Sequence, residues 1–213
     1  MFITASKSDH GKLLYSADKG SSWVVAGEFP HGLNSFIVYQ NKWIATAGNF
    51  KIYISEDSGK TWSEQWMQGT ISMEHITDIH SITYFYNRIY ICGGNELGLG
   101  FSGVSTDNGN HWIFYQTDHE LKSIVFRDEL NGITCGYGII YYTEDGGLTW
   151  HSAEQPGQFW TAAHYNRGYY FASSYSGEVI SSSDGKTWRT IHKGGGILNS
   201  QLQINSSSYM NET

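Results

Sequence analysis

Short apolar runs, each about five residues long, follow one another along nearly the whole chain and are separated by polar turns. The runs are rich in β-branched and aromatic residues and lack a helical period, which favours strands. In one stretch they fall at Asn34–Gln40, Trp43–Ala47, Lys51–Ser55 and Trp62–Trp66. Asn41 lies in the first intervening turn and tolerates the left-handed backbone of a hairpin tip. The pattern predicts groups of four antiparallel strands.

One motif, Ser-x-Asp-x-Gly-x-Thr-Trp, recurs five times and sets the period of this pattern. Its copies span residues 16–23, 55–62, 105–112, 143–150 and, one residue shorter, 182–188. Its aspartates are Asp18, Asp57, Asp107, Asp145 and Asp184, and its tryptophans are Trp23, Trp62, Trp112, Trp150 and Trp188. The Asp can accept hydrogen bonds from the backbone that follows, the Gly allows a positive φ, and the Trp can pack against the neighbouring sheet. Because catalysis needs different groups at one point, we interpret the motif as structural, in preference to calcium binding or catalysis.

A period near 40 residues with four strands per repeat is typical of propeller blades. We therefore predict an all-β fold: a five-bladed β-propeller of four-stranded antiparallel blades. The first repeat lacks a first strand, because Phe2–Ala5 matches the second strand of the other repeats. Residues 197–204 near the C-terminus would supply it and close the ring in a velcro closure. Residues 1–205 then form a single domain and 206–213 a polar tail. The alternative is an open fragment of a larger ring, completed by oligomerisation.

A small hydroxyl residue recurs in the first strand of the repeats. Ser35, Ser81, Ser123 and Thr161 carry it, and Ser200 repeats it near the C-terminus. This recurrence supports the assignment of residues 197–204 as a first strand.

The five motif copies resemble the Asp-box, or BNR, repeat of the sialidase-like propellers, and the resemblance covers all five repeats. The fourth repeat, residues 132–150, is also similar to repeats of the photosystem II assembly-factor family. In these families the box marks the fold and not an active site. A sialidase also needs an arginine triad that grips the substrate carboxylate. The arginines of this chain, Arg88, Arg127, Arg167 and Arg189, do not match that pattern, so the resemblance implies architecture without activity.

Charge and composition narrow the classes of partner. The chain has 13 Lys and Arg against 20 Asp and Glu, a net charge of −7, and no basic run, which argues against a nucleic-acid partner. No apolar run approaches the roughly 18–20 residues of a membrane span, and the N-terminus lacks a signal-peptide pattern. We therefore expect no membrane insertion and a cytoplasmic or virion-associated location. Cys92 and Cys135 are expected to be buried free thiols, with a single disulfide as the alternative.

Loop lengths indicate where a ligand would bind. The interval between Asp57 and Asp107 holds about eleven extra residues, shared by the loops at 67–78 and 93–100. Long loops on a rigid scaffold often carry binding. The candidate ligand-binding residues around this mouth of the ring are Glu74, His75, Asp78, His80, Asn95, Glu96, His119, Lys122, Trp160 and Tyr175, with Tyr137 and Phe159 nearby. Aromatic rings beside amide and carboxylate groups suit a sugar or a peptide. The alternative for Phe159 and Trp160 is packing between blades.

A metal site formed by His75, Asp78 and His80 is a weaker interpretation, because a polar loop leading into a strand explains them as well. We expect no metal, no cofactor and no catalytic residue. The sequence thus predicts a non-catalytic binding or scaffold propeller that recognises a carbohydrate or protein partner through its loop-rich face. The alternatives are a carbohydrate-active hydrolase with an unrecognised carboxylate pair, and a structural component of a larger assembly such as a phage virion.

Overall fold

The computed structural model is all-β where it describes the chain, with strands joined by turns, bends and irregular loops and without a helix. The described residues are 2–7, 10–39, 41–65, 67, 78–95, 97–154 and 157–194. Within them there is no helix of the length and apolarity that a membrane crossing requires. Their strands form five antiparallel sheets, as the repeating apolar runs predict.

Each sheet consists of strands that are consecutive in the sequence, so each corresponds to one repeat. The first sheet contains β1 (Phe2–Ala5), β2 (Gly11–Ser16) and β3 (Val24–Phe29). The second contains β4 (Leu33–Tyr39), β5 (Lys42–Ala47), β6 (Lys51–Ser55) and β7 (Ser63–Gln65). The third contains β8 (Asp78–Phe85), β9 (Arg88–Gly94), β10 (Gly100–Ser105) and β11 (Ile113–Thr117). The fourth contains β12 (Leu121–Phe126), β13 (Gly132–Gly136), β14 (Ile139–Thr143) and β15 (His151–Ser152). The fifth contains β16 (Trp160–Asn166), β17 (Tyr169–Ser174), β18 (Val179–Ser182) and β19 (Arg189–His192).

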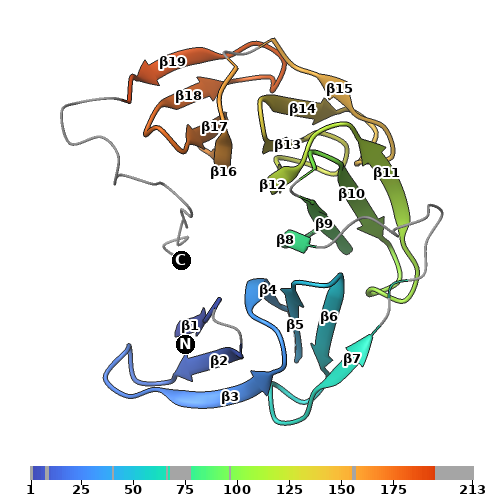
Figure 1. Ribbon diagram of the computed structural model, residues 1–213, viewed down its shortest axis with the longest axis vertical. Coiled ribbons are helices and arrows are strands. Elements are labelled where there is room, and N and C mark those ends of the chain that lie inside the picture. Colours follow the sequence, from blue (N-terminus) through green and yellow to red (C-terminus); the bar gives the residue numbers. More distant parts are fainter. Residues whose placement is uncertain are drawn as a thin grey trace.

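The sheets stand around a common centre in sequence order, like the blades of a propeller (Figure 1). The first strand of each four-stranded sheet is innermost, and β4, β8, β12 and β16 contact one another in turn. This arrangement agrees with the predicted five-bladed propeller. In the second repeat, the predicted strands match β4 to β7 to within one residue at each end.

The first sheet has three strands among the described residues, and β1 there pairs only with β2. Phe2–Ala5 thus occupies the second-strand position, as the sequence predicts. Residues 197–204, the predicted closing strand, and the predicted tail at 206–213 lie outside the described residues. The sheets β1–β3 and β16–β19 form the two ends of the described arc (Figure 1).

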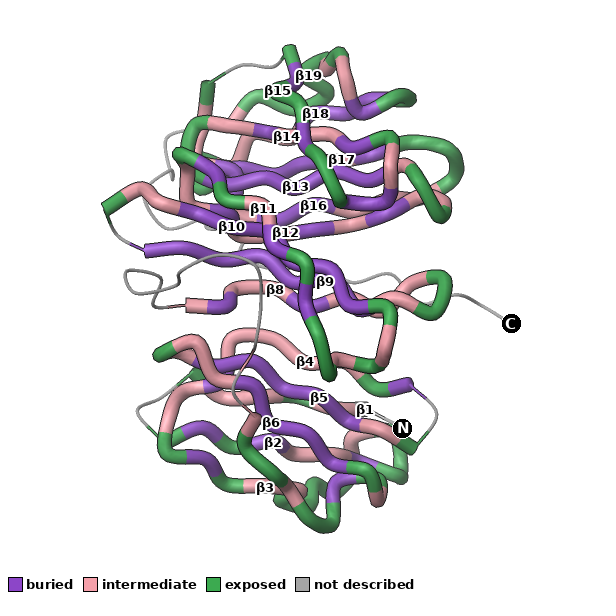
Figure 2. The backbone as a smooth tube through the Cα atoms, turned by 90° about the vertical axis from the view of Figure 1, so that its right-hand side faces the viewer, coloured by how far each residue is buried: buried purple, intermediate pink, exposed green. Residues whose placement is uncertain are grey.

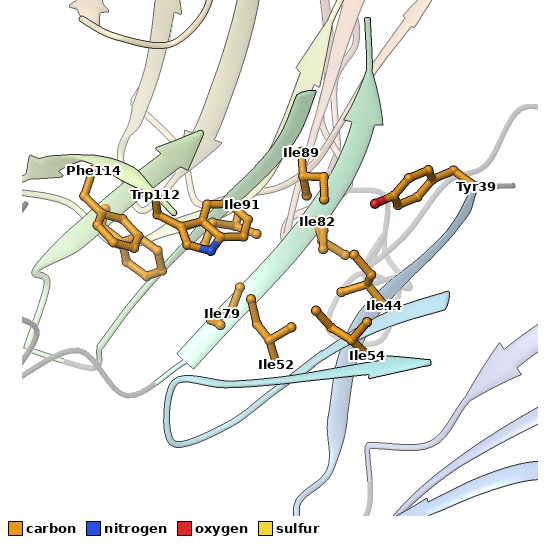
Figure 3. Close-up of a cluster of buried hydrophobic side chains, with 11 residues drawn as sticks. Tyr39, Ile44, Ile52, Ile54, Ile79, Ile82, Ile89, Ile91, Trp112 and Phe114 are labelled. Carbon is orange, nitrogen blue, oxygen red and sulfur yellow. The ribbon is translucent and has the colours of Figure 1, made fainter. Parts of the chain in front are cut away.

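Isoleucine and aromatic side chains fill the spaces between neighbouring sheets. Between the second and third sheets, Ile44, Ile52 and Ile54 face Ile91 and Trp112 (Figure 3). Figure 2 shows the same burial along the middle strands, where every residue of β10 and β13 is buried. Removing such apolar surface from water is the main stabilising contribution to the fold.

The repeated motif forms a hydrogen-bonded turn, here called a turn clasp, between the last two strands of each sheet. Asp57 Oδ1 accepts hydrogen bonds from Thr61 N at 2.8 Å and Ser55 Oγ at 2.8 Å, and Asp57 Oδ2 accepts one from Thr61 Oγ1 at 2.7 Å. Gly59 takes the positive φ of 85° that the turn needs. The hydrogen bonds from Thr61 hold the pKa of Asp57 at about 2, which shows that the turn stabilises the carboxylate form.

Four of the motif tryptophans pack against the preceding sheet, as predicted. Trp62 Nε1, for example, donates a hydrogen bond to Ala26 O in β3 at 2.9 Å. Trp112, Trp150 and Trp188 belong to or pack against the clusters between neighbouring sheets. Trp23 departs from the prediction and is 43% exposed, because no described sheet precedes β1–β3.

Cys92 in β9 and Cys135 in β13 are free and fully buried, as predicted. Burial raises the pKa of both thiols, to about 12 for Cys92, so neither is a reactive thiolate at neutral pH.

Candidate functional site

A β-bulge interrupts each of the four inner strands at the same place. The extra residues are Asn34 in β4, His80 in β8, Lys122 in β12 and Thr161 in β16. Bulges commonly re-aim a side chain, and here all four residues line one central channel. The fold therefore brings together four polar side chains that are about 40 residues apart in sequence.

The central channel has a volume of about 310 Å³ and a mostly polar lining. Ser35, Thr83 and His164 add hydroxyl and imidazole groups to the four bulge residues. The buried His164 Nε2 atom has no hydrogen-bond partner among the described residues, and burial lowers the pKa of this imidazole. His164 is therefore an uncharged imidazole that a polar ligand atom or water in the channel can satisfy.

Three charged or polar groups meet at one mouth of the channel. His80 Nε2 lies 2.7 Å from Glu120 Oε1, and Lys122 Nζ donates to the same oxygen at 2.8 Å. Lys122 Nζ is also 3.1 Å from His80 Nε2. The Glu120 side chain is only 13% exposed. Burial raises the pKa of its carboxyl, but the hydrogen bonds from His80 and Lys122 outweigh burial and leave the pKa below its usual range.

Two glycines make room for Glu120 at this position. A Cβ atom on Gly136 would lie 1.9 Å from Glu120 O, and one on Gly94 would lie 2.9 Å from Glu120 Cγ. The ends of β9 and β13 can thus approach the start of β12 closely only because both residues lack side chains. This packing fixes the carboxylate against the channel mouth.

A row of three aromatic rings borders the same mouth. Phe159 is flanked by Tyr137, with ring centroids 5.4 Å apart, and by Tyr175, with centroids 6.0 Å apart and an interplanar angle of 16°. Lys122 Nζ lies 5.8 Å from the centroid of Phe159, which joins the row to the ion cluster. Tyr137 and Tyr175 are 60% and 47% exposed, so their rings are available to a ligand.

Backbone hydrogen bonds hold the aromatic row in place. Tyr137 N donates to Glu120 O at 3.0 Å, and Tyr175 N donates to Phe159 O at 2.8 Å. The two tyrosines lie in the β13–β14 and β17–β18 connections, and Phe159 directly precedes β16. The row is thus anchored to the rigid sheets, which lowers the entropy lost when a ligand is bound.

The structure brings some of the predicted site residues together and separates others. His80, Lys122 and Tyr175 lie at the mouth described above. His119 Nδ1 is 3.2 Å from the Tyr141 hydroxyl, and Asp78 pairs with Gly48 at the edge of β8. Asn95 is 4% exposed and its Oδ1 accepts hydrogen bonds from Leu97 N and Leu99 N, so it organises its own loop. The predicted residues Glu74, His75 and Glu96 lie outside the described residues.

The prediction that Trp160 binds a ligand is wrong. Its side chain is completely buried and packs with Ile133, Ile140 and Tyr170 between the fourth and fifth sheets. The ring is not available to a ligand, so the alternative of packing between blades is the right one for this residue. The neighbouring Phe159, one position earlier, takes the place at the mouth instead.

The predicted alignment of Thr161 with the hydroxyl residues Ser35 and Ser123 is wrong by one residue. The strand register pairs Ala162 with Ser173, just as Ser123 pairs with Cys135, so Ala162 occupies the position of Ser35 and Ser123. Thr161 is the bulge residue that corresponds to Lys122.

Glu120 was missed by the sequence-based prediction. It directly precedes β12, as Phe159 directly precedes β16. An alignment of the repeats places these two residues at the same position and could have identified Glu120.

Within the described residues, no three His, Cys, Asp or Glu side chains come together in a way that could hold a metal ion. His75, one of the three residues considered for a metal site with Asp78 and His80, lies outside those residues.

Comparisons with known proteins support the fold but identify no family. No family model matches the chain, and no curated protein matches it. Among solved structures, YCF48 from Cyanidioschyzon merolae is similar with a TM-score of 0.57 and 14% identity, over 75% of this chain and 56% of that chain. YCF48 bound to D1 peptide matches with a TM-score of 0.60 and 16% identity, over 84% of this chain and 60% of that chain.

An ancestral GH74 enzyme is similar with a TM-score of 0.68 and 17% identity, over 89% of this chain but only 29% of that chain. The described chain therefore spans little more than half of the YCF48 chains and about a third of the enzyme. At these identities the likeness concerns the fold alone. The chain is a β-propeller, similar both to a protein with a bound peptide and to a glycoside hydrolase.

Proposed function

We propose that this protein is a non-catalytic binding propeller that recognises an extended segment of a protein partner at the mouth of its central channel. The observation that carries the proposal is the anchored row Tyr137–Phe159–Tyr175, with its two tyrosines exposed, beside the largely buried side chains of His80 and Glu120. Rigid aromatic rings offer a large contact area at low entropy, and polar groups next to them fix orientation.

The similar YCF48 structure has a bound D1 peptide, which supports a peptide-like ligand for a propeller of this shape. An extended segment also suits the geometry of the site. Its side chains can rest on the aromatic row while one polar group enters the channel lined by Asn34 and Thr161.

The ionisation of Glu120 favours binding over hydrolysis by this residue. A glycosidase acid needs a carboxyl with a raised pKa that can donate a proton. The pKa of Glu120, the carboxyl at the mouth, is lowered because its hydrogen bonds to His80 and Lys122 outweigh its burial. Two of the arginines that could bind a substrate carboxylate already have partners. Arg88 lies 3.6 Å from Glu129, and Arg127 donates a hydrogen bond to Ser183 O.

A carbohydrate is the second candidate ligand, because sugar rings stack on exposed tyrosines and the GH74 enzyme shares the fold. Selection from a random peptide library displayed on phage, run beside a glycan array, separates the two ligands. We expect peptides that bind the wild type and lose binding to the double variant Tyr137→Ala/Tyr175→Ala. Glycan binding with the same sensitivity and no selected peptide would replace the protein partner by a carbohydrate.

We also propose the finer features of the fold. The turn clasps support membership of the Asp-box, sialidase-like group of propellers. Among the described residues no strand pairs with the inner edge of β1, which supports closure by residues 197–204. In the described sheets, Ser35 Oγ accepts a hydrogen bond from Ile82 N and Ser123 Oγ accepts one from Ala163 N, each in the next inner strand. Ser200 would make the same bond to Phe36 N of β4.

Deletion of residues 195–213 tests the closure. We expect a lower melting temperature and loss of protection from hydrogen exchange in β1. Unchanged protection in β1 after the deletion would contradict the closure.

A further inference from the structure

The row Tyr137–Phe159–Tyr175 offers ring faces that favour a positively charged ligand group. The face of an aromatic ring carries partial negative charge and attracts cations. One ammonium group already uses this row, since Lys122 Nζ lies 5.8 Å from the centroid of Phe159. The two outer rings, Tyr137 and Tyr175, have no such cation among the described cation–ring contacts and are 60% and 47% exposed.

Most of the fixed positive charges near this mouth are matched by carboxylates. Lys122 donates to Glu120 at 2.8 Å, so its charge is matched by a carboxylate. Two other lysines on the same side of the ring are also paired: Lys12, in β2, with Glu28 at 2.7 Å, and Lys51, in β6, with Glu64. Lys193 is exposed and has no described ion pair, and its neighbour Gly194 packs against Ser176, next to Tyr175.

Carboxylates in neighbouring loops add to this balance. Asp118 is exposed in the loop before β12, and Glu178 lies in the same β17–β18 connection as Tyr175. The whole chain carries a net charge of −7. Over distances comparable with the Debye length, such a surface attracts a positively charged segment and repels an acidic one.

We propose that the row Tyr137–Phe159–Tyr175 binds a basic side chain, arginine in the first place, of the partner segment. The proposal rests on the proposed peptide-binding function and names the chemistry of its ligand. Arginine fits because its planar guanidinium is weakly hydrated and stacks flat on a ring. Tyr137 and Phe159, tilted by 58° to each other, present two ring faces at an angle, and Tyr175 extends the Phe159 side.

The test uses two probes of the same shape and different charge. Acetyl-Gly-Arg-Gly-amide is compared with acetyl-Gly-citrulline-Gly-amide, in which a neutral urea replaces the guanidinium. Binding is followed by NMR on protein with ¹³C-labelled tyrosine rings, and the signals of Tyr137 and Tyr175 are assigned with the single Tyr→Phe variants. We expect saturable shifts of both signals with the arginine probe and an affinity for citrulline about tenfold weaker.

Ring variants show whether the aromatic face is responsible. Tyr175→Phe keeps the ring and should bind the arginine probe as the wild type does, whereas Tyr175→Leu should bind it about tenfold less tightly. Tyr86→Leu is the matched control, because Tyr86 is 61% exposed in the β8–β9 turn, at the opposite end of the strands. Equal affinity for the two probes, or unchanged affinity in Tyr175→Leu, would overturn the proposal.

The outcomes also separate this inference from the proposed function. Library peptides that bind through Tyr137 and Tyr175 but lack Lys and Arg, together with equal affinity for the two probes, would overturn the basic ligand and leave the peptide-binding function standing. No selected peptide and no probe shift would overturn both.

Discussion

Glu120 accepts a hydrogen bond from Lys122 at 2.8 Å, and only one residue separates the two in the chain. Residues two apart in an extended segment point to the same side, and this pair meets His80 of the neighbouring blade. A local ion pair thereby becomes a connection between two blades at the channel mouth.

Glu120→Gln should lower the free energy of unfolding by about 1–3 kcal/mol at pH 7, because Lys122 loses its partner in a largely buried place. The folded-state pKa of Glu120 is below its ordinary value of 4.5. Its contribution is therefore complete above that value and is lost as the pH falls through the lower, folded-state pKa. Urea denaturation from pH 7 to pH 3 should show the wild type and the variant converging.

Glu129→Gln is the control for that experiment, because Glu129 is 58% exposed and 3.6 Å from Arg88. It should change stability by less than about 0.5 kcal/mol. A gap between wild type and Glu120→Gln that stays constant down to pH 3 would argue against the ion pair as its cause.

Asp145→Ala should destabilise the fold without changing ligand affinity in the folded fraction. Asp145 accepts hydrogen bonds from Thr149 N and Leu148 N at 3.0 Å and from Thr149 Oγ1 at 2.6 Å. Losing them should lower the free energy of unfolding by about 1–3 kcal/mol in thermal or chemical denaturation. The matched variant is Asp184→Ala in the shortened motif, where no described hydrogen bond joins Thr187 Oγ1 to the carboxylate. It should destabilise less, and the reverse order would contradict the clasp.

Ser123→Ala should weaken the contact between two inner strands. The Ser123 hydroxyl accepts a hydrogen bond from Ala163 N at 3.1 Å, across 40 residues of sequence. Without it the amide is left unsatisfied, which should cost about 1–3 kcal/mol and speed hydrogen exchange at Ala163. Ser63→Ala, at the outer strand β7, should leave that amide protected. Unchanged exchange at Ala163 in Ser123→Ala would show that the hydroxyl does not support the strand contact.

Trp160→Ala should be the most destabilising of these substitutions. The ring is fully buried, and emptying its place leaves a cavity that costs about 3–5 kcal/mol. Tyr175→Ala removes a ring of which 47% is exposed and should cost under about 1 kcal/mol. Calorimetry distinguishes them, and similar melting temperatures for the two variants would contradict the burial of Trp160.

The sequence alone determined what short-range interactions control. Asp57 and Thr61 lie four residues apart, so the turn that they form can be read from the motif. The alternation of apolar runs and turns gave the strands β4 to β7 for the same reason, since each hairpin depends on residues close in sequence. Counting the runs also predicted that Phe2–Ala5 takes a second-strand position, and β1 pairs with β2 alone among the described strands.

Only the tertiary structure decided which side chains meet at the centre of the ring. Thr161 lines the channel while Trp160, one residue earlier, is buried, because successive residues of a strand point to opposite faces. The bulge at Thr161 shifts the register by one residue, and such a shift exchanges the two faces. Glu120 meets His80 across 40 residues because two blades pack side by side. Such contacts depend on the rotation from blade to blade, and the pattern of apolar and polar residues within one repeat contains no record of that rotation.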